Sequence, residues 1–130
     1  MKKIVLAATA AVIMSCAAST ELLKDQSFNI TELNGTEYVS MGEETAGILF
    51  QDGRLNANLG GNSISAEYKE GADGTLSLEY ALSTKMLVPE EFREDEFISA
   101  LNNVTGFTIE GDVLTLLGKD GETLIKAQRK

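Results

Sequence analysis

Five acidic residues lie close together between positions 90 and 96: Glu90, Glu91, Glu94, Asp95 and Glu96. Carboxylate oxygens are the ligands that Ca²⁺ prefers, so this group is a candidate metal site. On a helix, however, acids four residues apart are like-charged neighbours, and no Asp-rich loop with a turn glycine holds these oxygens around an ion. We therefore interpret the group as a solvated helix face and predict no metal site.

A nucleophilic pair is a second possibility, because Ser83, Thr84 and Lys85 are adjacent. Neighbouring residues of a strand point to opposite faces, so Thr84 and Lys85 are not expected to meet. Ser83 and Lys85 share a face, but no oxyanion motif accompanies them. The chain has no histidine, which excludes histidine-based triads and histidine metal ligands. We assign no catalytic residue, expect no cofactor, and predict that the protein is not an enzyme.

Gly60 and Gly61 form a third candidate, since paired glycines let a backbone approach a ligand closely. A phosphate-binding loop would continue with Lys and Ser or Thr, and none follows here. Glycine within a strand pattern more often marks a bulge or a bend, so we interpret this pair as structural.

The start of the chain has the pattern of a secretory signal peptide. Lys2 and Lys3 precede an uninterrupted apolar run over residues 4–14. As a helix, such a run reaches about 16 Å, too short for a hydrocarbon core of about 30 Å. A basic start followed by a short apolar run is typical of a segment that directs export and is then removed. We predict that residues 1–15 are a signal peptide.

Cys16 is the sole cysteine, and the preceding Ile-Met-Ser makes the site resemble a bacterial lipobox, where cleavage exposes a cysteine that is lipidated. The alternative is an ordinary signal peptide cut within residues 17–19, which leaves no anchor. We favour lipidation, because a lone cysteine in an exported protein cannot form an internal disulfide. Two or more acyl chains anchor a protein stably. We expect Cys16 to hold the protein on the membrane, with residues 16–26 as a short tether.

Acidic side chains outnumber basic ones by 20 to 11, a formal net charge of −9. The leader removes Lys2 and Lys3 and no acid, so the exported chain carries −11. Such a charge favours a monomer and argues against nucleic acid, whose phosphates need clustered Lys and Arg. We expect a monomer whose partners are the membrane and another envelope protein. Ala17 stands where Asp would retain a lipoprotein at the inner membrane in enteric-type sorting, which favours the outer membrane.

Turn pairs separate runs in which apolar and polar residues alternate. Asn34-Gly35, Asp52-Gly53, Asp73-Gly74 and Asp120-Gly121 tolerate the positive φ of tight hairpins. The alternation predicts an antiparallel sheet with one buried face. About eight strands are expected, over residues 28–30, 48–51, 54–59, 63–68, 75–80, 107–110, 113–117 and 123–127.

One segment follows a helical period instead. Pro89 and the acids after it are typical of a helix start, which predicts a helix over residues 89–103. Its apolar stripe consists of Phe97, Ala100, Leu101 and Val104. The expected fold is α+β and mainly antiparallel: a curled or partly closed sheet of seven to eight short strands, with one amphipathic helix packed against it.

The curled sheet could enclose a small apolar ligand or be filled by its own side chains. The residues that would line either arrangement are Phe28, Phe50, Leu55, Leu59, Ile64, Tyr68 and Leu78. With about a hundred residues and few large aromatics, we expect a filled core.

Short patterns follow one another in a fixed order along the chain. They begin with Phe28 and Ile30 and continue with the motif positions Gly60, Asn62, Thr84, Lys85 and Met86. After the predicted helix come Phe97, Ile98, Leu101, Val104, Phe107, Ile109, Gly111, Asp112, Leu114, Leu116, Gly121 and Leu124. In this order, behind a lipobox, the patterns resemble the META domain family, which includes the heat-shock lipoprotein HslJ. We expect this domain over residues 27–130.

Gly61 and Val88 depart from the family pattern, because both stand where cysteines are common. Their joint replacement implies that the two positions touch or are bridged in relatives, and it removes any thiol role here. The family is mostly secreted or membrane-anchored in bacteria, is associated with stress tolerance, and has no established catalytic activity. The resemblance therefore implies a non-enzymatic, lipid-anchored envelope protein that binds another envelope component, in stress tolerance or envelope assembly. The alternative is a carrier or sensor of an apolar ligand held between sheet and helix.

Overall fold

The predicted strands pair in one antiparallel path that curls round on itself. This computed structural model describes residues 21–40, 45–84 and 87–130. Its strands are β2 (Ser27–Leu33), β3 (Thr36–Glu37), β4 (Gly47–Gln51), β5 (Arg54–Asn58), β6 (Ser63–Glu70), β7 (Leu76–Ser83), β8 (Gly106–Glu110), β9 (Val113–Leu117) and β10 (Thr123–Arg129). The short β3 is the one strand of the described chain that the alternation does not predict.

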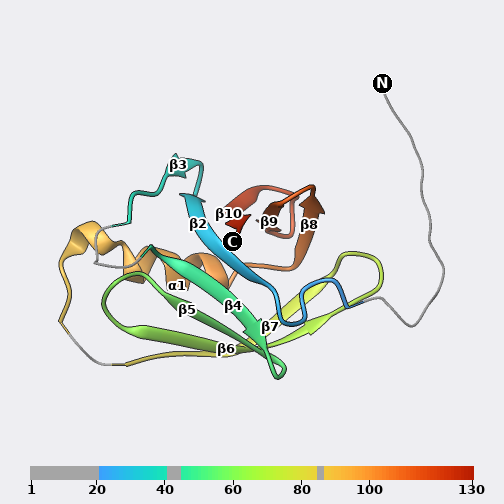
Figure 1. Cartoon of the computed structure of the whole chain (residues 1–130), viewed down its shortest axis with the longest axis horizontal. Coiled ribbons are helices and arrows are strands. Elements are labelled where there is room, and N and C mark those ends of the chain that lie inside the picture. The colour runs from blue at the N-terminus through green and yellow to red at the C-terminus, as the bar shows by residue number, and fades with distance from the viewer. Residues whose placement is uncertain (1–20, 41–44, 85–86) are drawn as a thin grey trace.

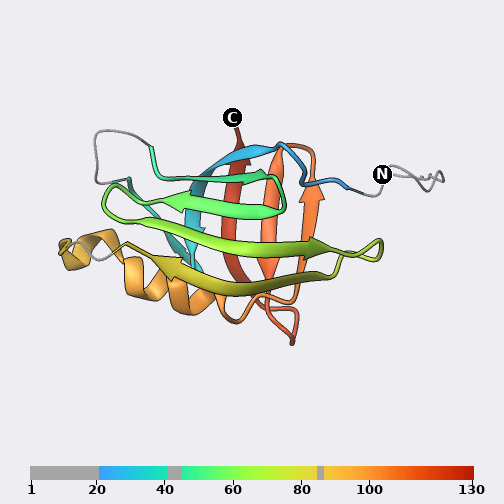
Figure 2. The ribbon, with the colours of Figure 1, turned by 90° about the horizontal axis from the view of Figure 1, so that it is seen from below.

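The sheet is a nearly closed barrel. Its strand order is β7-β6-β5-β4-β2-β10-β9-β8, and β3 pairs with β2 outside this path. The two end strands meet at a bridge between Thr75 and Gly106. Beside that bridge, the Leu76 amide donates to the Thr105 carbonyl at 3.0 Å. In Figure 2, strands β4 to β7 cross in front of β8, β9 and β10, which confirms the curled antiparallel fold.

Glycine-containing turns set the hairpins where the sequence indicates. Asn34 and Gly35 have φ values of 51° and 82°, and Asp52 and Gly53 have 55° and 77°. Two consecutive positive φ angles define the tight turn whose twist matches that of paired strands. These turns join β2 to β3 and β4 to β5.

The helical segment is shorter than predicted and is divided in two. A 3₁₀ turn, η3, covers Glu90–Phe92, and the α-helix α1 covers Glu94–Leu101. Arg93 between them has a φ of 56°, a left-handed conformation that stops one helix and starts the next along a new axis. The prediction of one helix over residues 89–103 is therefore wrong in its first turn, although the predicted apolar stripe is buried.

Helix α1 packs against the open side of the barrel, near β7 and β10 (Figure 1). Its Phe97 and Leu101 are almost fully buried and join the side chains from the inner face of the sheet. Phe28, Phe50, Leu55, Leu59 and Ile64 belong to this same cluster, and Tyr68 and Leu78 pack against it. The space between sheet and helix is thus filled, as expected.

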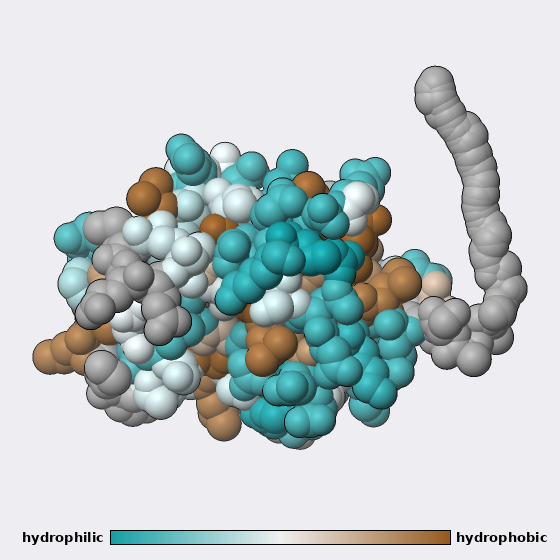
Figure 3. All heavy atoms as spheres, in the orientation of Figure 1, coloured by the Kyte–Doolittle hydropathy of each residue, from teal (hydrophilic) through white to brown (hydrophobic). Residues whose placement is uncertain are grey.

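The outer surface follows from the alternation of the strands. On the face seen in Figure 3, hydrophilic side chains cover much of the molecule and apolar ones emerge at separate points. Within the described ranges, no helix has the length and apolar character that a membrane span requires.

Candidate functional site

A buried polar cluster connects the start of β6 to the start of α1. Asn62 and Glu94 are the buried polar residues in the part of the chain that the structure describes, 5% and 6% exposed. The backbone amide of Asn62 donates to Oε2 of Glu94 at 2.7 Å, and Nδ2 of Asn62 donates to Oε1 at 2.7 Å. Each carboxylate oxygen therefore has a donor, which offsets the cost of removing the charge from water.

Thr84 joins this cluster from the end of β7. Its Oγ1 donates to Oδ1 of Asn62 at 2.7 Å and accepts from the Ser63 amide at 3.0 Å. The Thr84 amide in turn donates to the Ser63 carbonyl at 3.1 Å. The cluster consequently ties together three segments that are distant in sequence, at one end of the barrel.

Two backbone conformations bring these side chains together. Gly60 has a φ of 108°, which favours glycine, and its amide donates to Oδ1 of Asn58 at 2.6 Å. This bend after β5 turns Asn62 inward. On the other side, the left-handed Arg93 begins α1 at Glu94, so that the carboxylate lies in the first helical turn, where the helix dipole favours it.

Gly61 and Val88 are in direct contact beside the cluster. A Cβ placed on Gly61 would lie 2.3 Å from Cγ1 of Val88 and 2.7 Å from Oε2 of Glu94. Such distances are far below van der Waals contact, so this position has room only for glycine while Val88 and Glu94 keep their places. The contact agrees with what the family resemblance implies, that these two positions touch.

A surface hollow of about 680 Å³ opens beside this cluster. Asn62 and Glu94 line its buried part, and Leu87, Glu90 and Asp95 line it as exposed residues. Leu87 is fully exposed, at 102% of its reference area. The hollow thus has an exposed apolar side chain and exposed acids at its opening, and the hydrogen-bonded Asn62 and Glu94 at its base.

An ion pair fixes one side of the hollow. The Arg93 guanidinium donates from Nε to Oε1 of Glu96 and from Nη2 to Oε2, both at 2.9 Å. These hydrogen bonds lower the pKa of Glu96 and raise the pKa of Arg93, and a further hydrogen bond from Nδ2 of Asn34 also lowers the pKa of Glu96. Arg93 also donates to the Leu33 carbonyl at 3.1 Å. The pair therefore attaches the helical segment to the β2–β3 turn.

The structure brings together some of the predicted motif positions. Asn62 and Thr84 meet in this cluster, and Gly60 forms the bend that precedes it, whereas Lys85, Met86 and the expected lipidation residue Cys16 lie outside the described residues. The pairing of Ser83 with Lys85 lies outside them for the same reason.

Glu94 is the residue that sequence reasoning missed. The interpretation of Glu94 as part of a solvated face is wrong, because the break at Arg93 places Glu94 on the buried side. Arginine rarely adopts a left-handed conformation, so its presence at position 93 gives no signal in the sequence that Glu94 is buried. Glu90, Glu91 and Asp95 are exposed as expected.

This arrangement is suited to holding shape and to binding. Both carboxylate oxygens of Glu94 accept hydrogen bonds from Asn62, which holds the side chain in place. Across the described chain, no three potential metal ligands of the Asp, Glu, Cys and His types gather at one point.

Comparisons with known proteins agree with this fold. The fold is similar to a solved protein from Burkholderia xenovorans, with a TM-score of 0.65, 19% identity, and coverage of 93% of this chain and 95% of that one. It is also similar to a DUF4847 family protein from Bacteroides vulgatus, with a TM-score of 0.60, 20% identity, and coverage of 84% and 95%. No curated protein matches the sequence.

The sequence pattern of the META domain matches residues 21–130, which include every strand and helix described above. The chain belongs to the META domain family.

Proposed function

We propose that this META domain protein is a non-enzymatic, lipid-anchored component of the bacterial cell envelope, and that it binds another envelope protein through the hollow beside Asn62 and Glu94. The lipobox-like sequence at Cys16 supports the anchor, and Ala17 after it favours the outer membrane. The protein acts as a monomer, in envelope assembly or stress tolerance.

The observation that carries the binding role is the composition of the hollow. Leu87 is fully exposed and lies with the exposed acids Glu90 and Asp95 around one opening. Val88 and Ile98, which are half-buried, line the same hollow, and an apolar patch rimmed by polar residues is typical of a recognition surface. The partner therefore presents an apolar residue together with basic side chains.

An apolar cargo has less support. The space that it would need, between sheet and helix, is occupied by Phe97 and Leu101, which are 0% and 1% exposed. We therefore do not propose a carrier or sensor of such a ligand.

Photo-crosslinking in the host tests the binding role. A photoreactive residue at Leu87 is expected to capture one envelope protein, and the same residue at exposed Thr108 on β8 serves as the matched control. Replacing Glu90 and Asp95 with lysine is expected to abolish the Leu87 product. The same products from positions 87 and 108, or none above background from position 87, would count against the proposal.

A further inference from the structure

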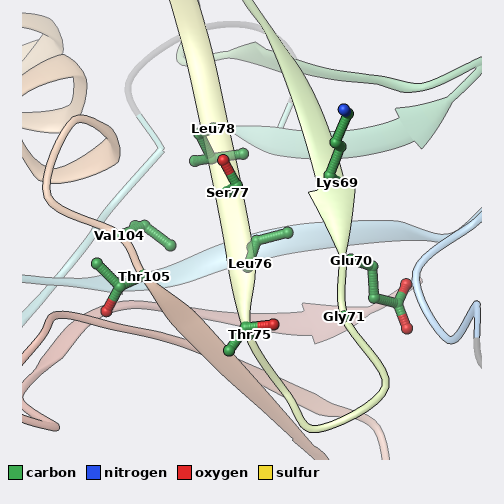
Figure 4. Close-up of a pocket in the computed structure, with 9 residues that line it drawn as sticks. All are labelled: Lys69, Glu70, Gly71, Thr75, Leu76, Ser77, Leu78, Val104 and Thr105. Carbon is green, nitrogen blue, oxygen red and sulfur yellow. The ribbon is translucent and has the colours of Figure 1, made fainter.

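The first described residues are fixed to the end of β6 that lies away from the candidate site. The amides of Leu22 and Leu23 donate to the two carboxylate oxygens of Glu70 at 2.6 and 3.0 Å. Leu23 is fully buried, and the Gln26 amide donates to its carbonyl at 3.0 Å. In Figure 4 the Glu70 side chain points toward this blue N-terminal segment. Residues 21–26, expected to be tether, are therefore packed on the domain.

Strand β6 separates this attachment from the candidate site. Glu70 ends the strand, and Asn62 lies directly before its first residue, Ser63. Eight residue steps at about 3.3 Å each place the two about 26 Å apart. Both views agree: the blue start of the described chain and η3 at the start of the helical segment lie toward opposite ends of the long axis (Figures 1 and 2).

The remaining tether is shorter than this separation. Five residue steps connect Cys16 to Glu21, and a fully extended chain spans at most about 18 Å over that length. An anchor at Cys16 would therefore hold the Glu70 end close to the bilayer. The net charge of −11 expected for the exported chain repels anionic headgroups, which keeps the rest of the domain from lying flat.

We infer, resting on the anchor proposed above, that the domain stands on the lipid surface with its Glu70 end toward the bilayer and holds the hollow at Asn62 and Glu94 away from it. A second hollow of about 470 Å³, lined by Lys69, Glu70 and Leu76 among others, lies at the membrane-facing end (Figure 4). The partner consequently reaches the site from the aqueous side.

Energy transfer on vesicles tests this orientation. The lipidated protein is purified from its host with one added cysteine, Ala72→Cys beside the Glu70 end or Glu91→Cys beside the site. Both positions are exposed, so neither change disturbs packing. The proteins are labelled with a thiol-reactive donor dye and placed in phosphatidylethanolamine–phosphatidylglycerol vesicles that carry acceptor dye on their headgroups. Because Asn62 and Glu70 are about 26 Å apart along β6 and the labelled positions lie beside these two ends, transfer from position 72 is expected to exceed transfer from position 91.

Two controls separate the possible failures. The unaltered protein has one cysteine, Cys16, so it takes up no dye if that thiol is lipidated. An inserted Gly-Ser linker of about twelve residues after Cys16 is expected to abolish the difference between the two positions, because a flexible linker of that length frees the domain. If the unaltered protein is labelled, the Cys16 thiol is not lipidated, and this result contradicts both the anchor and the orientation. If it is not labelled, equal transfer from positions 72 and 91, or greater transfer from 91, overturns the orientation alone.

Discussion

The Cβ of Val88 lies 3.2 Å from the point that a Cβ on Gly61 would occupy. Disulfides join residues whose Cβ atoms are about 3.5 to 4.5 Å apart, so a shift of a few tenths of an ångström makes this pair bridgeable. The domain thus keeps the geometry of a cross-link without the cysteines that would form it, and packing holds the two segments together.

A pair of cysteines at positions 61 and 88 is expected to stabilise the domain. In a Cys16→Ser background, Gly61→Cys with Val88→Cys should form a disulfide whose loop closure contributes about 3 kcal/mol to the free energy of unfolding. The net gain is expected to be smaller than this, because a Cβ at position 61 also lies 2.7 Å from Oε2 of Glu94. Thiol titration and thermal unfolding, with and without reductant, measure the effect. Thiols that stay free under oxidising conditions would contradict the geometry.

Gly61→Ala alone is expected to destabilise the domain by about 1–3 kcal/mol, since its methyl group overlaps Val88 and Glu94. Urea unfolding measures the change. The control is Ala72→Val on the exposed β6–β7 turn. Gly53→Ala is unsuitable, because a side chain at the positive φ of 77° would itself destabilise the turn. Equal stability of the Gly61 variant and the unaltered protein would show that Val88 moves freely.

The polar cluster gives a second stability prediction. Asn62→Ala removes the side-chain donor to the buried carboxylate of Glu94 and the acceptor for Thr84. The loss is expected to lower the free energy of unfolding by about 1.5–3 kcal/mol, the range for hydrogen bonds to charged groups. Asn56→Ala, an exposed amide on β5, is the matched control and should have little effect in the same urea titration.

The Arg93–Glu96 pair predicts a dependence on pH. Hydrogen bonds from Arg93 and Asn34 lower the pKa of Glu96 below the 4.5 of an unperturbed glutamate. A carboxylate whose pKa is lower in the folded state stabilises the fold above its unfolded pKa, and this contribution is lost as pH falls through the folded pKa. Glu96→Gln should therefore lower the Tm more at pH 6 than at pH 3. Glu110→Gln is the control, and a pH-independent effect of Glu96→Gln would contradict the assignment.

The Glu70 clamp gives a local prediction. Glu70→Ala removes the acceptor of the Leu22 and Leu23 amides, so hydrogen exchange at these two amides should accelerate. The control is Glu79→Ala. Glu79 is an exposed acid on β7, and its replacement should leave exchange at the Leu22 and Leu23 amides unchanged. Exchange that does not respond to Glu70→Ala would show that burial of Leu23 alone fixes this segment.

The strands could be predicted because their signals are local. Turn pairs such as Asp52-Gly53 and the alternation through Leu55 and Ala57 each determine structure over a few residues. Closure of the barrel through Thr75 and Gly106 depends on segments far apart in sequence. The alternation therefore indicates a curled sheet but not which two strands meet to close it.

The candidate site was predictable only in part. Family patterns singled out Asn62 and Thr84, which are joined by a hydrogen bond, and Gly60, whose amide instead donates to Asn58. Glu94 was missed because its burial depends on one non-glycine residue, Arg93, in a left-handed conformation that helix periodicity does not reveal.

Intact-mass spectrometry of the exported protein, purified from its host membranes, tests the central claim most directly. The account predicts a chain that begins at Cys16 and carries the added mass of acyl chains on that residue. A chain with an unmodified Cys16 thiol, or one cut within residues 17–19, would contradict the anchor and the tethered role that depends on it.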